Sequence, residues 1–362
     1  MLKSYYFIIS SLLYIHVNAQ IITNYSSEDG LLDNFVNSIA VDINDNIWVG
    51  TIVGVCIYDP MNDTWSIPLD YSPDAPTNNI KVLQAMSNGD IWIGTDFGAS
   101  IFDGSSWVTY TSDTITTGSH MAIISNQVKS IDEEIGGSGG SVWIGTNLGV
   151  SRLDPTIAAP TQSYGSPYVH WSGINATAAL SNANDVWFSS PLGGITHFDG
   201  TTFTPYSTSN GLLSQNATAL LIDFQGNKWI GTDLGMSVLN ASNTSFVDHI
   251  EMYSLPPPHD SINPVVDIAM DSYGRIWTAI YVGYLAEGGV AMWNGNQWED
   301  FHVSDGLAGP NVRGLAIDSQ DNIWVATSTG VSKISAIPSA VIAIKNNGFD
   351  LFPNPSNDKI YI

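Results

Sequence analysis

Short apolar stretches separated by turn-forming residues run through most of the chain, and one of them recurs. It reads apolar, Trp, apolar, small, Thr, as in residues 47–51. Seven copies are recognisable, and their tryptophans stand 42 to 51 residues apart: Trp48, Trp92, Trp143, Trp187, Trp229, Trp277 and Trp324. A period of this length is typical of solenoids and propellers. The near absence of helical periodicity argues against helical repeats.

Each copy divides into four short strands. The first is apolar and ends in an acidic turn (36–41), the second carries the Trp, the third follows a turn that ends in Gly (98–103), and the fourth is aromatic and polar (64–66). Asp-Gly and Asp-Pro pairs favour tight hairpin turns between the third and fourth strands. The pattern predicts an all-β protein, a seven-bladed β-propeller of four-stranded antiparallel blades over residues 20–336.

The two ends of the repeat region predict how the ring closes. The last copy stops after its third strand, residues 330–334, whereas residues 21–25 read as a fourth strand that belongs to no copy of their own. An open ring would expose two unpaired sheet edges, which promote aggregation. We therefore expect the N-terminal strand to complete the last blade.

Residues 1–19 have the pattern of a secretory signal peptide. Lys3 precedes an uncharged apolar run over residues 5–15, and Val17-Asn18-Ala19 offers small residues for cleavage. The alternative is a membrane anchor, for which the apolar run is short. Later in the chain nothing resembles a membrane span. We expect a protein that is secreted or held at the cell surface after passing through the periplasm.

Composition narrows the range of partners. The 362 residues include 34 acidic and 10 basic side chains, for a formal charge of −24. Nucleic acid is a poor candidate partner, because 10 basic side chains are too few to neutralise a phosphate backbone. An anionic membrane surface is disfavoured for the same reason. A hydrophobic share of 44% excludes a disordered acidic tail. The single cysteine, Cys56, rules out an intrachain disulfide.

The repeat, Asn-x-Val/Ile followed by Asp-x-x-Gly/Asn-x-Ile-Trp-Ile-Gly-Thr-x-x-Gly-Val-Ser, resembles the two-component regulator propeller repeat over about residues 20–336. Copies four and six depart most, with Ser189-Ser190-Pro191 in place of Gly-Thr and a longer insertion at residues 280–288. In that family such propellers often form the extracytoplasmic sensor half of hybrid histidine kinases, in several cases for oligosaccharides. The resemblance implies a binding module here.

The C-terminal end carries a second resemblance. After an expected linker at residues 337–346, residues 347–362 contain Phe-Pro-Asn-Pro-Ser and Ile-Tyr-Ile. This segment resembles the truncated start of the type IX secretion sorting domain of Bacteroidetes, which implies the type IX secretion machinery as a partner. The alternative is an arbitrary tail with Pro-Asn-Pro turns.

A ring of polar residues is the candidate ligand site. Several first strands open with Asn, and in a propeller these positions share a face with the turns between second and third strands. Amides and carboxylates around a central mouth can bond hydroxyl groups. Two tyrosines in the long loop of copy six could add a stacking wall. The candidates are Asn79, Asp96, Asn147, Asn175, Asn216, Asp233, Asn263, Tyr281, Tyr284 and Asn311. The alternative is that the Asn side chains cap local turns.

Other candidate chemistry has a simpler structural explanation. A Trp repeated in every copy is better explained by packing between blades than by sugar stacking. The acidic turns at 42–46 and 318–322 resemble fragments of calcium loops but lack their completion, so hairpin turns are favoured. The histidines have no metal-ligand spacing. Cys56 stands where other copies have Ser, which predicts a buried structural thiol. No catalytic residue, metal or cofactor is predicted.

Three hypotheses about the function remain. The first is a secreted, non-catalytic module that binds an extracellular glycan or protein. The second is a propeller lyase or hydrolase acting on an extracellular substrate. Streptogramin lyases are also seven-bladed and use a His with a metal, but no matching His and acid pattern is evident here. The third is a structural adhesin, which needs no pocket.

Overall fold

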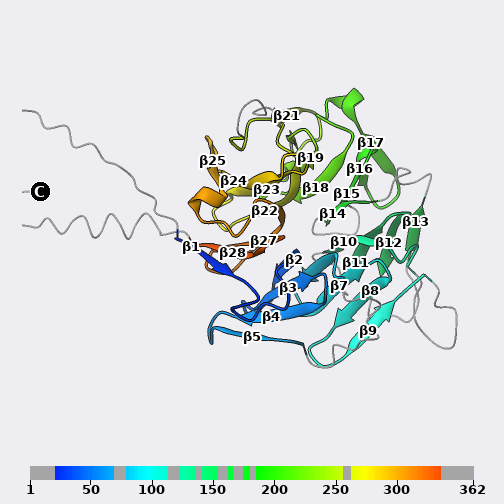
Figure 1. Ribbon diagram of the computed structural model, residues 1–362. Helices are drawn as coiled ribbons and strands as arrows, with labels where there is room; N and C mark the ends of the chain where they lie inside the picture. Colours follow the sequence, from blue (N-terminus) through cyan, green and yellow to red (C-terminus); the bar gives the residue numbers. More distant parts are fainter. Residues whose placement is uncertain are drawn as a thin grey trace, which may run out of the picture. The chain divides into compact units, whose positions relative to one another are not determined.

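The computed structural model describes residues 21–68, 79–112, 123–134, 141–153, 162–165, 174–179, 185–255 and 262–335. These residues form seven four-stranded antiparallel sheets, as the repeats predicted (Figure 1). The signal-peptide, linker and sorting-domain predictions fall on residues 1–19 and 337–362, which lie outside the described residues. Within the described part of the chain, no helix has the length and apolar character needed to cross a membrane.

Strands at the same position of each blade correspond in sequence. The first strands are β2 (Val36–Val41), β6 (Val82–Ala85), β10 (Val128–Glu133), β14 (Ala176–Ala179), β18 (Ala217–Ile222), β22 (Val265–Met270) and β26 (Val312–Ile317). The second strands, which carry the tryptophans, are β3 (Ile47–Thr51), β7 (Ile91–Thr95), β11 (Val142–Thr146), β15 (Val186–Ser190), β19 (Lys228–Thr232), β23 (Ile276–Val282) and β27 (Ile323–Thr327).

The two outer strands complete each sheet. The third strands are β4 (Val55–Asp59), β8 (Gly98–Phe102), β12 (Gly149–Leu153), β16 (Gly194–Phe198), β20 (Met236–Leu239), β24 (Glu287–Trp293) and β28 (Gly330–Ser335). The fourth strands are β5 (Thr64–Ser66), β9 (Trp107–Tyr110), β13 (Gln162–Gly165), β17 (Phe203–Tyr206), β21 (Phe246–His249), β25 (Trp298–Phe301) and β1 (Ile21–Tyr25). Two single-turn 3₁₀ helices, η1 (Thr208–Asn210) and η2 (Val303–Asp305), follow β17 and β25.

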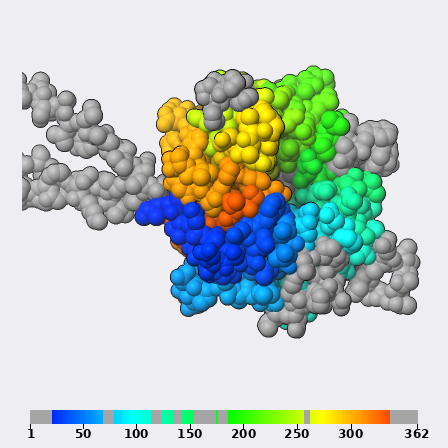
Figure 2. Space-filling view, in the orientation of Figure 1, coloured from blue at the N-terminus to red at the C-terminus, as the bar shows by residue number. Residues whose placement is uncertain are grey.

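The N-terminal strand completes the last blade, as predicted. The sheet order is β1-β28-β27-β26, and Figure 2 shows the dark blue N-terminal strand against the orange-red end of the repeat region. The side-chain amide of Asn24 holds this strand in place through two hydrogen bonds. Its Nδ2 donates to the Gly306 carbonyl at 2.7 Å, and its Oδ1 accepts from Ser332 Oγ at 2.7 Å. Strand pairing thus covers an edge that would otherwise be open.

The repeated tryptophans fill the wedges between blades. The Trp48 ring of the first blade contacts Phe102 of the second, with centroids 5.9 Å apart. Trp324 of the last blade contacts Tyr58 of the first at 5.6 Å. Every one of the seven indoles is at most 7% exposed. Because aromatic burial contributes large apolar areas to a core, this repeated contact explains why each copy keeps a Trp.

Aspartates of the acidic turns accept hydrogen bonds from four of these tryptophans. In the first blade the Asp42 carboxylate accepts the Asn44 and Asn46 amides through Oδ1, at 2.8 and 2.9 Å. Its Oδ2 accepts the Trp48 indole N–H at 3.0 Å. The same Asp–Trp bond recurs at Trp229, Trp277 and Trp324. These carboxylates therefore cap hairpin turns and satisfy indoles, which supports the turn interpretation over the calcium one.

Third-strand serines anchor the chain where it arrives from the preceding sheet. Ser237 Oγ accepts the Leu213 amide at 3.0 Å, and Ser332 Oγ accepts the Ala308 amide at 2.8 Å. Cys56 occupies this position in the first blade, where its sulfur receives the backbone N–H of Leu32 and is 2% exposed. Burial raises the pKa of the Cys56 thiol to about 11. The thiol is thus buried and structural, as predicted.

Candidate functional site

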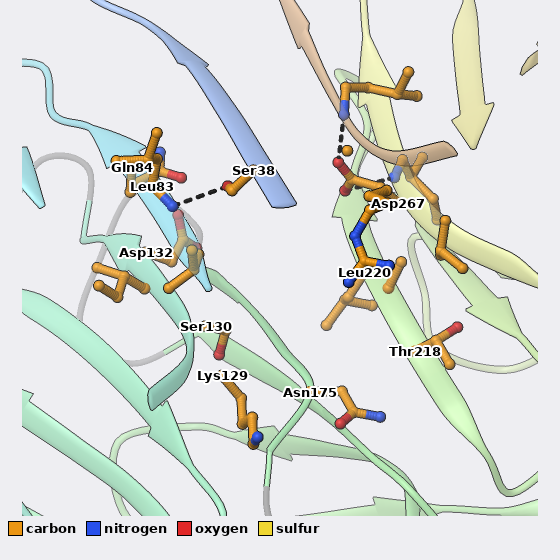
Figure 3. A pocket seen from close by; sticks show the side chains of 18 of the residues that line it. Ser38, Leu83, Gln84, Lys129, Ser130, Asp132, Asn175, Thr218, Leu220 and Asp267 are labelled. Atoms are coloured by element: carbon orange, nitrogen blue, oxygen red, sulfur yellow. Dashed lines mark hydrogen bonds between the residues drawn. The ribbon is translucent and has the colours of Figure 1, made fainter. Parts of the chain in front are cut away.

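The first strands surround a central cavity of about 580 Å³ (Figure 3). Each first strand contacts the first strands of both neighbouring blades, and contacts between β26 and β2 close this inner ring. The walls come from β2, β6, β10, β18, β22 and β26, with Lys81 just before β6 and Asn175 just before β14. All seven blades therefore contribute to one cavity, whose volume lies in the range of small-molecule sites.

A bulge at the start of the first strands decides which side chains face this cavity. In the pairing of β2 with β3 the register shifts between Val36 and Ser38, so that Asn37 is the extra residue. Equivalent shifts occur in β10, β18, β22 and β26. A bulge redirects a side chain relative to the strand's alternation. The residues at this position, which we call the rim ring, all line the cavity: Asn37, Lys81, Lys129, Asn175, Thr218, Val266 and Arg313.

Three members of the rim ring are cations. Lys81 Nζ lies 3.4 Å from the Asp96 carboxylate. Arg313 Nε donates to Asn37 Oδ1 at 3.1 Å, and its guanidinium lies 5.0 Å from the Phe35 ring centroid. Lys129 is exposed, and no described carboxylate lies within ion-pair distance of it. Burial lowers the pKa of Arg313, and the nearby Tyr281 opposes that effect.

The other cations of the described residues have a different role. Arg152, Lys228, Arg275 and Lys333 each lie over the indole of a repeat tryptophan, with distances of 4.9 to 6.0 Å to the ring centroid. Such cation–π contacts stabilise packing. Every described cation is therefore either over a blade tryptophan or at the rim of the central cavity.

Below the rim a few acidic and polar side chains line the cavity among mostly apolar residues. Asp132 and Gln84 lie three residues further along their strands than Lys129 and Lys81, which corresponds to roughly 10 Å. Asp267 joins two blades, since Oδ1 accepts the Ile268 amide at 2.9 Å and Oδ2 the Leu315 amide at 2.8 Å. The Ser130 hydroxyl is buried and has no hydrogen-bond partner among the described residues. Figure 3 shows these side chains around the cavity.

Asp267 should make stability depend on pH. Burial raises the pKa of Asp267 to about 6 from its ordinary value of 3.8, although two backbone N–H donors favour the carboxylate. As pH rises from about 4 to about 6, the unfolded chain loses this proton before the folded chain does, so the stability that this group contributes is lost over that window. We expect the melting temperature of the wild type to fall across it relative to that of Asp267→Asn. A difference between the two proteins that does not change with pH would contradict this assignment.

The sequence-predicted site residues separate into two groups. Asn175 lines the cavity and donates through Nδ2 to the Ala217 carbonyl at 3.0 Å. Asn263 is fully buried and accepts the Met252 and Tyr253 amides, at 2.7 and 2.8 Å, which is local capping. Asn147 and Asp233 each accept a serine hydroxyl from the chain segment that leads into their own blade, Ser125 and Ser214.

The remaining candidates lie near the rim without forming the cavity wall. Asn79 Oδ1 accepts from Asn37 Nδ2 at 3.0 Å, and Asp96 pairs with Lys81, so both support rim residues. Asn216 and Asn311 contribute backbone carbonyls, which accept the amides of Asp233 and Ser328. None of these four is a lining residue among the described part of the chain.

The long insertion of the sixth blade extends a hairpin. β23 and β24 have seven residues each, and Tyr281 pairs with Gly288 beyond the usual end of the second strand. Tyr281 is half-buried, whereas Tyr284 in the following turn is 68% exposed. The insertion thus brings Tyr281 close to Arg313, and a stacking role for the two tyrosines stays a prediction.

The described histidines are engaged in packing. His197 Nε2 lies 2.8 Å from Asp185 Oδ1, and its ring stacks on Trp187 with centroids 4.4 Å apart. Burial lowers the pKa of His249, which lies 5.8 Å from Trp229 by ring centroids. Among the described residues, no three His, Cys, Asp or Glu side chains are grouped closely enough to hold a metal ion.

Comparison with protein-family models finds one family. Two segments, residues 30–52 and 306–329, match the two component regulator propeller family. They contain β2 and β3 of the first blade and β26 and β27 of the last. The resemblance of the repeat to this family is thereby confirmed at two of the seven copies.

Solved structures show the same fold at low sequence identity. The extracellular domain assigned to a hybrid two component system of B. thetaiotaomicron has a TM-score of 0.71 and 19% identity, and the match covers 88% of this chain and 42% of that one. A streptogramin B lyase has a TM-score of 0.64 and 14% identity, covering 88% and 98%. Virginiamycin B lyase from Staphylococcus aureus has a TM-score of 0.62 and 14% identity, covering 88% and 99%. A search of curated proteins gave no match.

Proposed function

We propose that this protein is a non-catalytic extracellular binding module, and that its ligand is a glycan held in the central cavity. The observation that carries the proposal is the composition of the rim ring. The same backbone position recurs in all seven blades, but its side chains belong to five residue types, of which only Asn and Lys occur twice. A position that served packing alone would keep one residue type, as the repeat tryptophans do. Variation at one structurally fixed position is what an asymmetric ligand requires.

The chemistry of the rim favours a glycan over a folded protein. Asn37, Asn175 and Thr218 supply amide and hydroxyl groups that can bond sugar hydroxyls. A cavity of about 580 Å³ has room for a few sugar units, whereas a folded partner would contact an outer surface. Tyr281 lies close to Arg313 at the rim, although it is not among the residues that line the cavity. The family match and the extracellular neighbour support a location outside the cytoplasm.

The test is a screen of short oligosaccharides against the full chain, followed by calorimetry and a variant that fills the cavity. Val266→Phe adds bulk at the rim, and we expect it to weaken binding at least tenfold. Val247→Phe is the matched control, because Val247 lies in the outer strand β21 and is 61% exposed. Exchange of Tyr281 and Tyr284 for Ala should weaken binding without changing thermal unfolding. Binding that Val266→Phe leaves intact would refute the cavity as the site.

The two other functional hypotheses, an enzyme and a structural adhesin, predict different outcomes of the same screen. A lyase or hydrolase would convert the bound oligosaccharide into products that mass spectrometry detects. A structural adhesin would show no saturable binding of any small sugar. Absence of product together with saturable binding supports the non-catalytic module.

We further propose that residues 1–19 direct export and that residues 347–362 address the protein to type IX secretion. The support is the sequence pattern of these segments. Deleting residues 347–362 in a host with that machinery should leave the protein in the periplasm. Unchanged release of the shortened protein would contradict the assignment.

A further inference from the structure

The rim of the central cavity concentrates positive charge in a strongly acidic protein. The chain carries 10 basic against 34 acidic residues, and three of the basic ones, Lys81, Lys129 and Arg313, lie at the same structural position of three blades. The remaining described cations cover blade tryptophans. A packing role therefore accounts for those four, but not for the three at the rim.

We propose that the cavity selects an anionic oligosaccharide, whose carboxylate or sulfate group is bound by the rim cations. This inference rests on the proposed function, because it names the class of glycan that the same cavity takes. Charge-assisted hydrogen bonds from Lys and Arg to oxyanions are among the stronger polar contacts that proteins make. A protein with net charge −24 repels anions at long range, so it needs a local cationic site of this kind to hold one.

Hydrogen bonds pre-position one side of this site. Arg313 Nε donates to Asn37 Oδ1 at 3.1 Å, while Asn37 Nδ2 donates to the Ile80 carbonyl at 2.8 Å and to Asn79 at 3.0 Å. The guanidinium is thereby held at the rim by a neighbouring blade, with donors left over for a ligand. Held groups lose less conformational entropy when a ligand binds.

The other side of the site has free cationic capacity. Lys129 is exposed and has no ion-pair partner among the described residues, and the buried Ser130 hydroxyl beside it is likewise unpartnered there. Lys81 is partly compensated by Asp96 at 3.4 Å, a pair whose side chains are about one-third exposed. Solvent screens such a pair, so Lys81 keeps much of its capacity to attract a ligand anion.

The acidic interior sets the orientation of the ligand. Asp132 and Asp267 line the cavity below the rim, where a second ligand anion would be repelled. Their oxygens are acceptors, which suit the hydroxyl groups of a sugar. The geometry therefore places the ligand's acid group at the rim and its neutral hydroxyl-bearing part toward Asp132 and Asp267.

Calorimetry with matched probes tests the proposal on the full chain. The probes are trigalacturonate, its methyl ester, and a galactose trisaccharide carrying sulfate esters. We expect the ester to bind at least tenfold more weakly than the acid, because it keeps the sugar shape and loses the charge. Lys129→Gln and Arg313→Gln should each weaken binding of the acid about tenfold, and higher salt should weaken it in the wild type. Lys333→Gln is the control, since Lys333 lies over Trp324 and away from the cavity.

Each outcome decides between defined alternatives. Binding of the uronate or of the sulfated sugar tells which oxyanion the rim takes. Equal binding of acid and ester, or binding that neither rim substitution changes, overturns the anionic ligand. If the neutral ester binds as tightly as the acid and Val266→Phe abolishes that binding, the proposed glycan function stands while this inference fails. If no sugar binds saturably, both fall, and preferred binding of a polyglutamate peptide would replace the sugar by an acidic protein segment.

Discussion

Deleting β1 should turn a monodisperse protein into one that aggregates and melts at a much lower temperature. The deletion removes the whole fourth strand of the last blade, so β28 becomes an exposed edge that can pair with a second molecule. It also removes the Tyr25 ring, which stacks on Trp324 with centroids 5.6 Å apart and contacts Tyr58 at 4.8 Å. The measurements are thermal unfolding and light scattering on chains that begin at residue 20 or at residue 26.

A point substitution separates lost packing from lost pairing. Tyr25→Ala keeps the strand but removes the ring, and we expect it to cost about 2–3 kcal/mol, below the 3–5 kcal/mol typical of fully buried aromatics because Tyr25 is half-buried. Thr23→Ala, at an exposed position of the same strand, is the control and should change stability by less than about 0.5 kcal/mol. A deletion variant that stays monodisperse and melts unchanged would show that β1 does not close the ring.

The repeat made most of the fold predictable. The Trp of each copy marked the position of the second strand. Because the last copy lacks a fourth strand after residues 330–334, residues 21–25 were predicted to replace it, and the sheet order confirms this. The buried environment of Cys56 followed from its alignment with Ser100, Ser151 and Ser237. Such inferences succeed because residues at equivalent repeat positions meet the same neighbours in every blade.

The cavity wall was predictable only in part, for a reason that lies in the backbone. An alternating strand assigns side chains to two faces by counting residues, but one bulge residue shifts that count. Asn175 was identified, whereas Lys129 and Arg313 at the equivalent position were not. The scarcity of cations was the available signal, since three of ten occupy the start of a first strand. Asn263 was a candidate site residue, but in the structure its side chain caps the backbone locally. Nothing in its sequence context distinguishes such a cap from a rim residue.

The Asp318 carboxylate should be among the most costly side chains to remove. It is 5% exposed, and Oδ1 accepts the Gln320 and Asn322 amides at 3.0 and 2.9 Å. Oδ2 accepts the Trp324 indole N–H at 2.9 Å. Asp318→Ala leaves that buried N–H without a partner in the blade that closes the ring. Because an unsatisfied buried group costs about 1–3 kcal/mol and the turn also loses its cap, we expect a loss of about 3–5 kcal/mol in urea unfolding.

A second aspartate supplies the matched control for this loss. Asp199 caps an exposed turn by accepting the Thr201 and Thr202 amides at 2.9 and 2.7 Å, but no indole bonds to it. Asp199→Ala should therefore cost only about 1 kcal/mol, the value of a surface cap. Asp318→Asn should fall between the two, since its amide must present a donor either to the indole or to the turn amides. Equal losses for the two alanine variants would mean that turn capping, and not the buried indole, explains why four of the seven copies keep an Asp six residues before the Trp.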